Sequence, residues 1–141
     1  MHIIKDCRMR CCKIACSHPF NQISGALSDT LQYVRVPVIT NRECRKFYDY
    51  DLWSMICAGY PGKGGKDACL GDSGGPLVCA TGGKAVLVGV VSWGFECASP
   101  YFPGVYSRTK GVLDFIQCGM VSSGHIFQRN QNKPNFKINV L

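Results

Sequence analysis

Ser73 is the residue of this sequence best suited to covalent chemistry. It lies in the stretch Gly71-Asp72-Ser73-Gly74-Gly75, with glycines close to it on both sides. Glycines allow a sharp, exposed turn and leave no side chain to obstruct an approaching acyl group. The amides of Gly71 and Ser73 could converge on one point, where they would stabilise the oxyanion of a tetrahedral intermediate by roughly 3–4 kcal/mol per donor. The pattern therefore predicts acyl transfer through a serine nucleophile.

The same five residues also match the looser Gly-x-Ser-x-Gly pattern of α/β-hydrolases. That fold needs a strand before the serine and a helix directly after it. Here the serine turn is followed by Leu77-Val78-Cys79, a strand-like run, and strands do not alternate with helices anywhere in the chain. We therefore do not expect an α/β-hydrolase.

The elements that would position Ser73 are mostly short strands. Sixteen glycines and seven prolines divide the chain into short apolar runs, as in turn-rich β proteins. Four runs have the alternating or apolar pattern of strands, namely residues 32–38, 76–80, 86–93 and 104–108. A capping box at Thr40 and Glu43 predicts a short helix through about Phe47, and residues 110–118 could form a second, amphipathic helix. An all-β, barrel-like fold is expected.

The chain divides into three parts by composition and charge. Residues 1–21 are a basic, cysteine-rich segment without a clear period, residues 22–118 form the expected domain, and residues 119–141 are polar and expected to be disordered. The formal charge of +7 comes mostly from the ends, because residues 1–18 and 119–141 together carry seven Lys or Arg and one Asp. Nucleic acid is therefore not an expected partner. Nor is a membrane, since the most apolar run, residues 85–93, suits a buried strand.

Ten cysteines in 141 residues indicate an oxidising compartment, and we expect an extracellular protein, although no apolar run of signal-peptide length opens the chain. Cys7, Cys11, Cys12 and Cys16, with His18, could be imagined as a metal site. Their spacing fits none of the usual zinc patterns, so disulfides or free thiols are the preferred interpretation. No metal or other cofactor is expected.

Several short blocks, taken together and in order, resemble one family. These are Cys57-Ala58-Gly59-Tyr60, the stretch from Asp67 to Pro76, Ser92-Trp93-Gly94 followed by Cys97, and Pro103-Gly104-Val105-Tyr106. They resemble the chymotrypsin and trypsin family of serine peptidases, from about Ser24 to Ile116. The resemblance implies the second of that family's two antiparallel Greek-key β-barrels, closed by a short C-terminal helix.

By this resemblance Ser73 is the nucleophile of a serine-type endopeptidase, and the amides of Gly71 and Ser73 form the oxyanion hole. Asp72 takes the place of the carboxylate that is buried against a new N-terminus after activation. Because no Ile-Val-Gly-Gly site precedes the domain, we expect Asp72 to be solvated or misplaced.

The resemblance also implies a specificity pocket for substrates with Arg or Lys before the scissile bond. Asp67 stands at its base, and Gly94 and Gly104 are its walls. The backbone of Ser92, Trp93 and Gly94 would pair with the substrate chain. Ala68 stands where many members place a serine, which predicts a preference for Arg over Lys.

Two disulfides follow from the resemblance, Cys44 with Cys57 and Cys69 with Cys97. Cys79 resembles a third half-cystine, for which Cys16 is a candidate partner. The partners of Cys7, Cys11, Cys12 and Cys118 are left open.

The family's base, a histidine oriented by an aspartate, belongs to its first barrel. No segment here resembles that barrel, and His2, His18 and His125 all lie in the unmatched ends. We therefore expect an incomplete domain that needs a first barrel to supply the His and Asp. The alternative is a non-catalytic pseudoprotease fragment that binds basic peptides.

Overall fold

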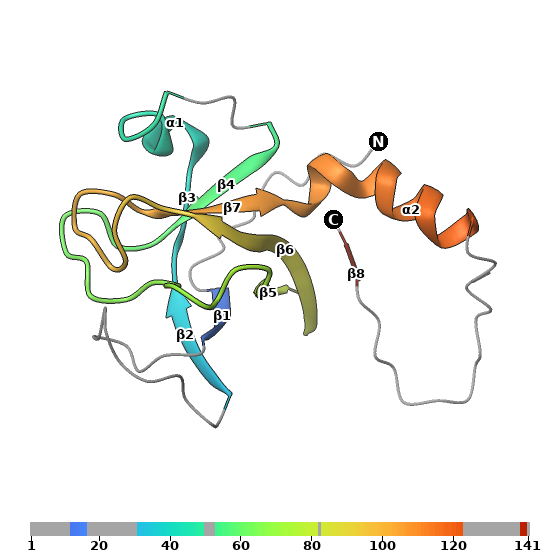
Figure 1. Cartoon of the computed structure of the whole chain (residues 1–141), viewed down its shortest axis with the longest axis horizontal. Coiled ribbons are helices and arrows are strands. Elements are labelled where there is room, and N and C mark those ends of the chain that lie inside the picture. The colour runs from blue at the N-terminus through green and yellow to red at the C-terminus, as the bar shows by residue number, and fades with distance from the viewer. Residues whose placement is uncertain (1–11, 17–30, 50–52, 82, 123–138, 141) are drawn as a thin grey trace.

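The computed structural model describes residues 12–16, 31–49, 53–81, 83–122 and 139–140, and these form a mostly antiparallel sheet with short helices (Figure 1). The strands are β1 (Cys12–Cys16), β2 (Gln32–Val36), β3 (Val38–Ile39), β4 (Met55–Ala58), β5 (Pro76–Thr81), β6 (Lys84–Trp93), β7 (Gly104–Arg108) and β8 (Asn139–Val140). The helices are α1 (Asn41–Cys44), the 3-10 helix η1 (Thr109–Val112) and α2 (Leu113–Ser122). The expected all-β class with a C-terminal helix is confirmed.

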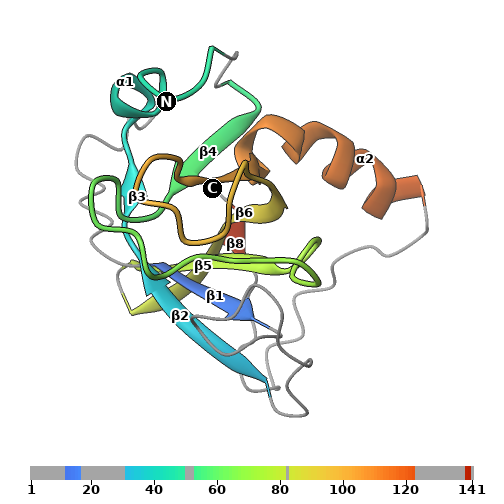
Figure 2. The same ribbon diagram turned by 60° about the vertical axis from the view of Figure 1, so that its left-hand side comes forward.

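The sheet closes on itself through one interrupted strand. Its order is β2-β1-β5-β6-β7-β4-β3, so β2 and β3 stand at opposite ends of the order although only Pro37 separates them in the chain. Pro37 lacks a backbone donor and interrupts a ladder. Its carbonyl still accepts a hydrogen bond from Gly59 at 3.0 Å. The same stretch therefore pairs with β1 on one side and β4 on the other, which makes a barrel (Figure 2).

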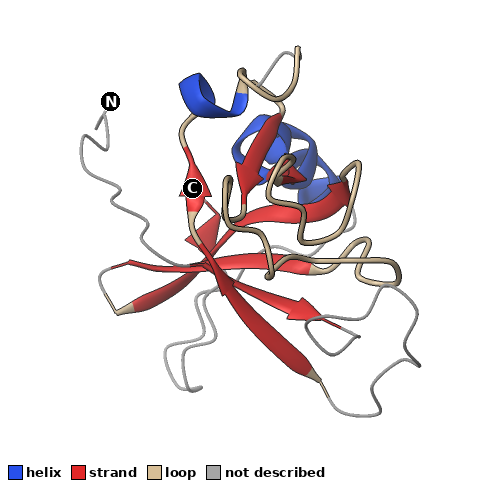
Figure 3. Ribbon diagram, turned by 90° about the vertical axis from the view of Figure 1, so that its left-hand side faces the viewer, coloured by secondary structure: helices blue, strands red, loops and turns tan. Residues whose placement is uncertain are grey.

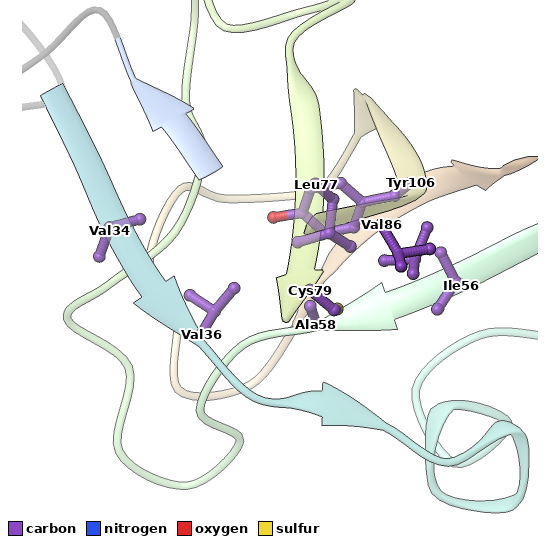
Figure 4. Packing of buried hydrophobic residues seen from close by; sticks show 9 residues of the cluster. Val34, Val36, Ile56, Ala58, Leu77, Cys79, Val86 and Tyr106 are labelled. Atoms are coloured by element: carbon purple, nitrogen blue, oxygen red, sulfur yellow. The ribbon is translucent and has the colours of Figure 1, made fainter. Parts of the chain in front are cut away.

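The connections within the barrel follow a Greek key. β5, β6 and β7 are consecutive antiparallel neighbours, whereas β4, which precedes them, lies beside β7. Side chains from opposite walls fill the interior, including Val36, Ile56, Leu77 and Tyr106 (Figure 4). Burial of this apolar surface is the main force that holds the walls together.

Helix α1 begins as the sequence predicts and ends earlier. The Thr40 hydroxyl accepts a hydrogen bond from the Glu43 amide at 3.2 Å, and the Glu43 carboxylate accepts one from the Thr40 amide at 3.4 Å, which completes the capping box. The helix ends at Cys44 rather than near Phe47. Beyond it, Lys46 and Phe47 donate to carbonyls three residues back, as in tight turns.

Two segments assigned to the ends of the chain differ from the sequence-based expectation. Residues 12–16, placed in a separate N-terminal part, form β1 and pair with both β2 and β5. Figure 3 draws the strands in red. A disordered tail was expected to begin at residue 119, but α2 extends through Ser122. Asn139–Val140 pairs in parallel with β6. Both strands are specified by partners distant in sequence, which a local pattern does not reveal.

No helix in the described part of the chain is long and apolar enough to cross a membrane.

Candidate active site

A cavity of about 270 Å³ opens among the turn before β5, the end of β6 and the start of β7. Of the residues assigned from the sequence to catalysis or substrate binding, seven line it: Asp67, Ala68, Ser73, Ser92, Trp93, Gly94 and Gly104. The cavity therefore brings together the proposed nucleophile and the proposed carboxylate at the pocket base. Gly71 and Asp72 are neighbours of Ser73 in the chain and are not among the residues that line the cavity.

The Ser73 turn is fixed to β6 by backbone hydrogen bonds. The Gly74 amide donates to the carbonyl of Val91 at 3.0 Å, and the Val91 amide donates to the carbonyl of Gly75 at 2.9 Å. Gly71 and Gly74 have φ angles of +90° and +83°, which glycine adopts readily. The Ser73 side chain is left exposed on a turn whose ends are held.

The amides proposed as oxyanion donors have no acceptor in the part of the chain that the structure describes. Neither Gly71 nor Ser73 donates a backbone hydrogen bond there, although the neighbouring amides of Asp72, Gly74 and Gly75 all do. Two amides beside an exposed hydroxyl could bind an oxygen that carries negative charge.

Asp72 is buried, contrary to the alternative that it would be solvated, while the alternative that it is misplaced stays a prediction. Its side chain is only 5% exposed, and Oδ2 accepts a hydrogen bond from the Cys69 amide at 2.8 Å. The Asp72 amide in turn donates to the carbonyl of Cys69 at 3.0 Å. The solvated alternative failed because it ignored the Cys69 amide, a donor that this short loop itself supplies to the carboxylate.

Asp67 is held by three donors. Its Oδ1 accepts from the Ala68 amide at 2.8 Å and from the Tyr106 hydroxyl at 3.2 Å, while Oδ2 accepts from the Ala98 amide at 3.3 Å. Burial nevertheless raises the pKa of this carboxyl to about 6, against the opposing effect of the hydrogen bonds. A positive group that entered the cavity would compensate for this loss of hydration and favour the ionised form.

Gly104 leaves the space that Asp67 occupies. A Cβ at this position would lie 2.5 Å from Asp67 Oδ1 and 3.1 Å from the Tyr106 hydroxyl oxygen. At Gly94, on the facing segment, the nearest atom to such a Cβ would be Gly104 Cα at 3.9 Å, an ordinary contact. The two glycines therefore differ in how strictly the folded chain requires them.

Gly104→Ala is expected to destabilise the fold by about 1–3 kcal/mol, the usual effect of overpacking. The added methyl group would force the Asp67 carboxylate away from its donors. Urea unfolding monitored by circular dichroism measures the change, with Gly94→Ala as the matched control. Equal stability of the two variants would contradict the proposed role of Gly104.

Both disulfides that the resemblance implies are present, Cys44–Cys57 and Cys69–Cys97. The second joins the segment before Ser73 to the segment after Gly94, so it connects two sides of the cavity. In the chain-entropy model each closed loop contributes on the order of 3 kcal/mol.

Cys79 is also disulfide-bonded. Cys16 is a poor candidate for its partner, because the strand register places the Cα of Cys12 opposite that of Cys79, and Cys16 lies four positions further along β1. Four residues of strand span about 13 Å, too far for a disulfide. Cys118 is an exposed free thiol.

β6 has an irregular register beside the cavity. Val91 pairs with Tyr106 and Trp93 pairs with Val105, so Ser92 is an additional residue opposite β7. Pairing with β5 ends at Val90, after which the Val91 amide bonds to Gly75. The backbone of residues 92–94 therefore lies beyond the β5 ladder, where an extended peptide could pair with it.

Among the residues that shape the cavity and received no role from the sequence are Tyr106, Ala98 and Glu96. Tyr106, 1% exposed, lies in the core and reaches Asp67 with its hydroxyl. Ala98 adopts a φ of +56°, unusual for a residue other than glycine, and donates its amide to Asp67. Glu96 also lines the cavity. Tyr106 belonged to a recognised block, whereas nothing in the sequence distinguished Ala98 or Glu96.

The described residues hold no group of three or more His, Cys, Asp or Glu that could bind a metal ion. The postulated Cys7, Cys11 and His18 ligands lie outside those residues. So do all three histidines, His2, His18 and His125.

Comparisons with known proteins point to one family. A family model described as Trypsin matches residues 6–116. The chain is 48% identical to Trypsin-1 from Astacus astacus over 99 residues, which cover 69% of this chain and 41% of that protein. It is 51% identical to Venom protease from Bombus pensylvanicus over 90 residues (64% and 37%), and 48% identical to Clotting factor G beta subunit from Tachypleus tridentatus over 100 residues (63% and 32%).

The chain belongs to the trypsin family of serine endopeptidases. It spans less than half the length of the three relatives named above. The family match begins at residue 6, within the segment that the sequence analysis had set apart.

Proposed function

We propose that this chain carries the nucleophile and the specificity pocket of an endopeptidase that cleaves after Arg or Lys. The observation that supports it best is the single cavity lined by both Ser73 and Asp67. A substrate side chain with a positive group at its end would reach Asp67 while its carbonyl carbon lies at Ser73. One residue of the substrate would thus be bound by its charge and attacked at its carbonyl.

In the proposed reaction the Ser73 hydroxyl attacks the scissile carbonyl, and the amides of Gly71 and Ser73 bind the resulting oxyanion. The substrate chain pairs with the backbone of residues 92–94. A serine hydroxyl is a weak nucleophile at neutral pH, so a base must accept its proton. We assign that role to a histidine, oriented by an aspartate, on a first barrel.

The experiment that tests this function is a chimera. The N-terminal barrel of Trypsin-1 from Astacus astacus would be joined to this chain, and hydrolysis of matched peptides with Arg, Lys or Phe before the scissile bond would be compared. Rapid cleavage after Arg and Lys, with little after Phe, supports the proposal. Peptide binding without cleavage would favour a pseudoprotease instead.

Ala68 predicts that the chimera prefers Arg to Lys. The Ala68 side chain lines the cavity beside Asp67 without offering a hydroxyl, which deprives an ammonium of a partner more than a forked guanidinium. Ala68→Ser should therefore raise kcat/KM for the Lys peptide about fivefold, the effect of one hydrogen bond of roughly 1 kcal/mol, and change the Arg peptide less. Equal rates for Arg and Lys before the substitution would contradict this explanation.

The pKa of Asp67 predicts how binding of a cation depends on pH. Benzamidine carries an amidinium that mimics the end of an Arg side chain and needs the ionised carboxylate. With a pKa of about 6 in the free protein, its affinity should be constant well above pH 6 and about tenfold weaker at pH 5 than at pH 7. Titration calorimetry of the full chain would measure this, and an affinity independent of pH would contradict it.

The same raised pKa has the opposite effect on the free protein. Folding favours the protonated form of Asp67, so its contribution to stability is fully present below pH 3.8 and is lost as the pH rises through about 6. In the protein without a ligand, Asp67 therefore stabilises the fold only in acid. At neutral pH a bound cation would offset the unfavourable burial of the ionised carboxylate.

We place the protein outside the cell. The disulfides Cys44–Cys57 and Cys69–Cys97 persist in an oxidising compartment, and a peptidase whose acidic pocket selects basic residues would act there on protein substrates.

A further inference from the structure

Glu96 lies at the same cavity as Asp67. Of the residues that line the cavity, these two are the carboxylates, and none is Lys, Arg or His. Asp67 is partly buried and accepts hydrogen bonds from the Ala68 amide and the Tyr106 hydroxyl, whereas Glu96 is exposed to solvent. The cavity therefore offers negative charge at two depths.

The Glu96 carboxylate is held in place. Its Oε2 accepts a hydrogen bond from the Ser99 hydroxyl at 3.0 Å, and the same hydroxyl oxygen accepts one from the Tyr101 amide at 3.2 Å. Ser99 is only 7% exposed, so the hydroxyl that joins the two groups is buried, whereas Glu96 and Tyr101 are exposed. The adjoining Cys97 is fixed by its disulfide to Cys69.

No basic side chain in the described ranges pairs with Glu96, so its negative charge is not neutralised there. A carboxylate that is positioned by one oxygen, exposed to solvent and unpaired with a cation can accept an incoming positive group at little cost in side-chain entropy.

We infer that Glu96 is a specificity-determining residue that binds a second positive charge of the substrate, on the N-terminal side of the cleaved Arg or Lys. This inference rests on the proposed function. A substrate antiparallel to residues 92–94 places its cleaved residue nearest Ser92, and its preceding residues run past Gly94 towards Glu96. The preferred substrates are peptides in which a basic residue precedes the cleaved one by a few positions.

The test compares two probes on the full chain by titration calorimetry at pH 7.5. Benzamidine carries one amidinium, and pentamidine carries two on a flexible linker. Beyond the statistical factor of two, the second charge should tighten binding about fivefold, as expected for one partly screened ion pair. Glu96→Gln should remove that advantage, and it should weaken pentamidine binding more than benzamidine binding.

Two further variants test the cause. Asp114→Asn removes one exposed negative charge from α2, outside the cavity, and should preserve the advantage of pentamidine. Ser99→Ala keeps the charge of Glu96 and frees its carboxylate, so the advantage should shrink without vanishing.

The outcomes distinguish a failure of the second charge site at Glu96 from a failure of the pocket at Asp67. If benzamidine binds but pentamidine gains nothing, or if Glu96→Gln keeps the gain, Glu96 does not bind a second charge. If benzamidine itself does not bind, the proposed acidic pocket for a basic side chain is wrong, and the role of Glu96 is wrong with it.

Discussion

Replacing Ser73 with alanine in the chimera is expected to abolish peptide hydrolysis. Loss of a serine nucleophile lowers kcat by on the order of a million-fold, because no other group forms the acyl intermediate. The side chain is exposed and the turn is held by backbone hydrogen bonds, so the fold should be unaffected. Hydrolysis of an Arg peptide, measured beside the thermal unfolding temperature, gives both results.

Ser92→Ala is the matched control for this variant. Ser92 lines the same cavity, and its proposed contribution is made by its backbone. Activity within about tenfold of the parent is expected, since backbone pairing survives the change. Comparable losses in the two variants would mean that Ser73 has no special chemical role.

Replacing Asp67 with asparagine should have the second largest effect. Removing one partner of a desolvated ion pair costs about 3–5 kcal/mol, so kcat/KM for an Arg peptide should fall by about 10²- to 10⁴-fold. A matched Phe peptide should be affected far less, because it never forms the pair. If both substrates slow equally, Asp67 maintains the fold of the site and does not select the substrate.

The stability of Asp67→Asn provides an independent check. In the free protein the carboxylate is ionised at neutral pH against an unfavourable environment, as its pKa of about 6 indicates. A neutral side chain of nearly the same shape should leave the free energy of unfolding at pH 8 unchanged or slightly higher. A large loss of stability would point to hydrogen bonds that asparagine cannot replace.

The strands around the site were predicted well where their own residues carry the pattern. The range 104–108 coincides with β7, and 76–80 and 86–93 lie within β5 and β6. β1 was missed because its five residues, CKIAC, do not alternate regularly between apolar and polar side chains, and because the strand is held by ladders to β2 and β5, distant in sequence. Its cysteines were interpreted as possible metal ligands or disulfide partners, and the segment was not interpreted as a strand.

The residues of the site could be predicted where a glycine or a charged side chain stands in a recognisable motif. Ser73, Asp67 and Gly104 were found by type and motif, and they line one cavity. The hydrogen bonds that position Asp67 could not be predicted, because the Tyr106 hydroxyl and the Ala98 amide lie 39 and 31 residues away in the chain. The burial of Asp72 was missed although its donor is close in sequence, because that donor is a backbone amide, three residues away, which no side-chain pattern indicates.

The central claim is that Ser73 and Asp67 act on the same substrate residue. An arginine-like peptidyl diphenyl phosphonate, applied to the chimera and followed by peptide mass spectrometry, tests it most directly. We predict a covalent adduct on Ser73 that forms at least about 100-fold faster than with the matching phenylalanine-like probe, and Asp67→Asn should remove this difference. An adduct on another residue, or an equal rate with both probes, would contradict the account.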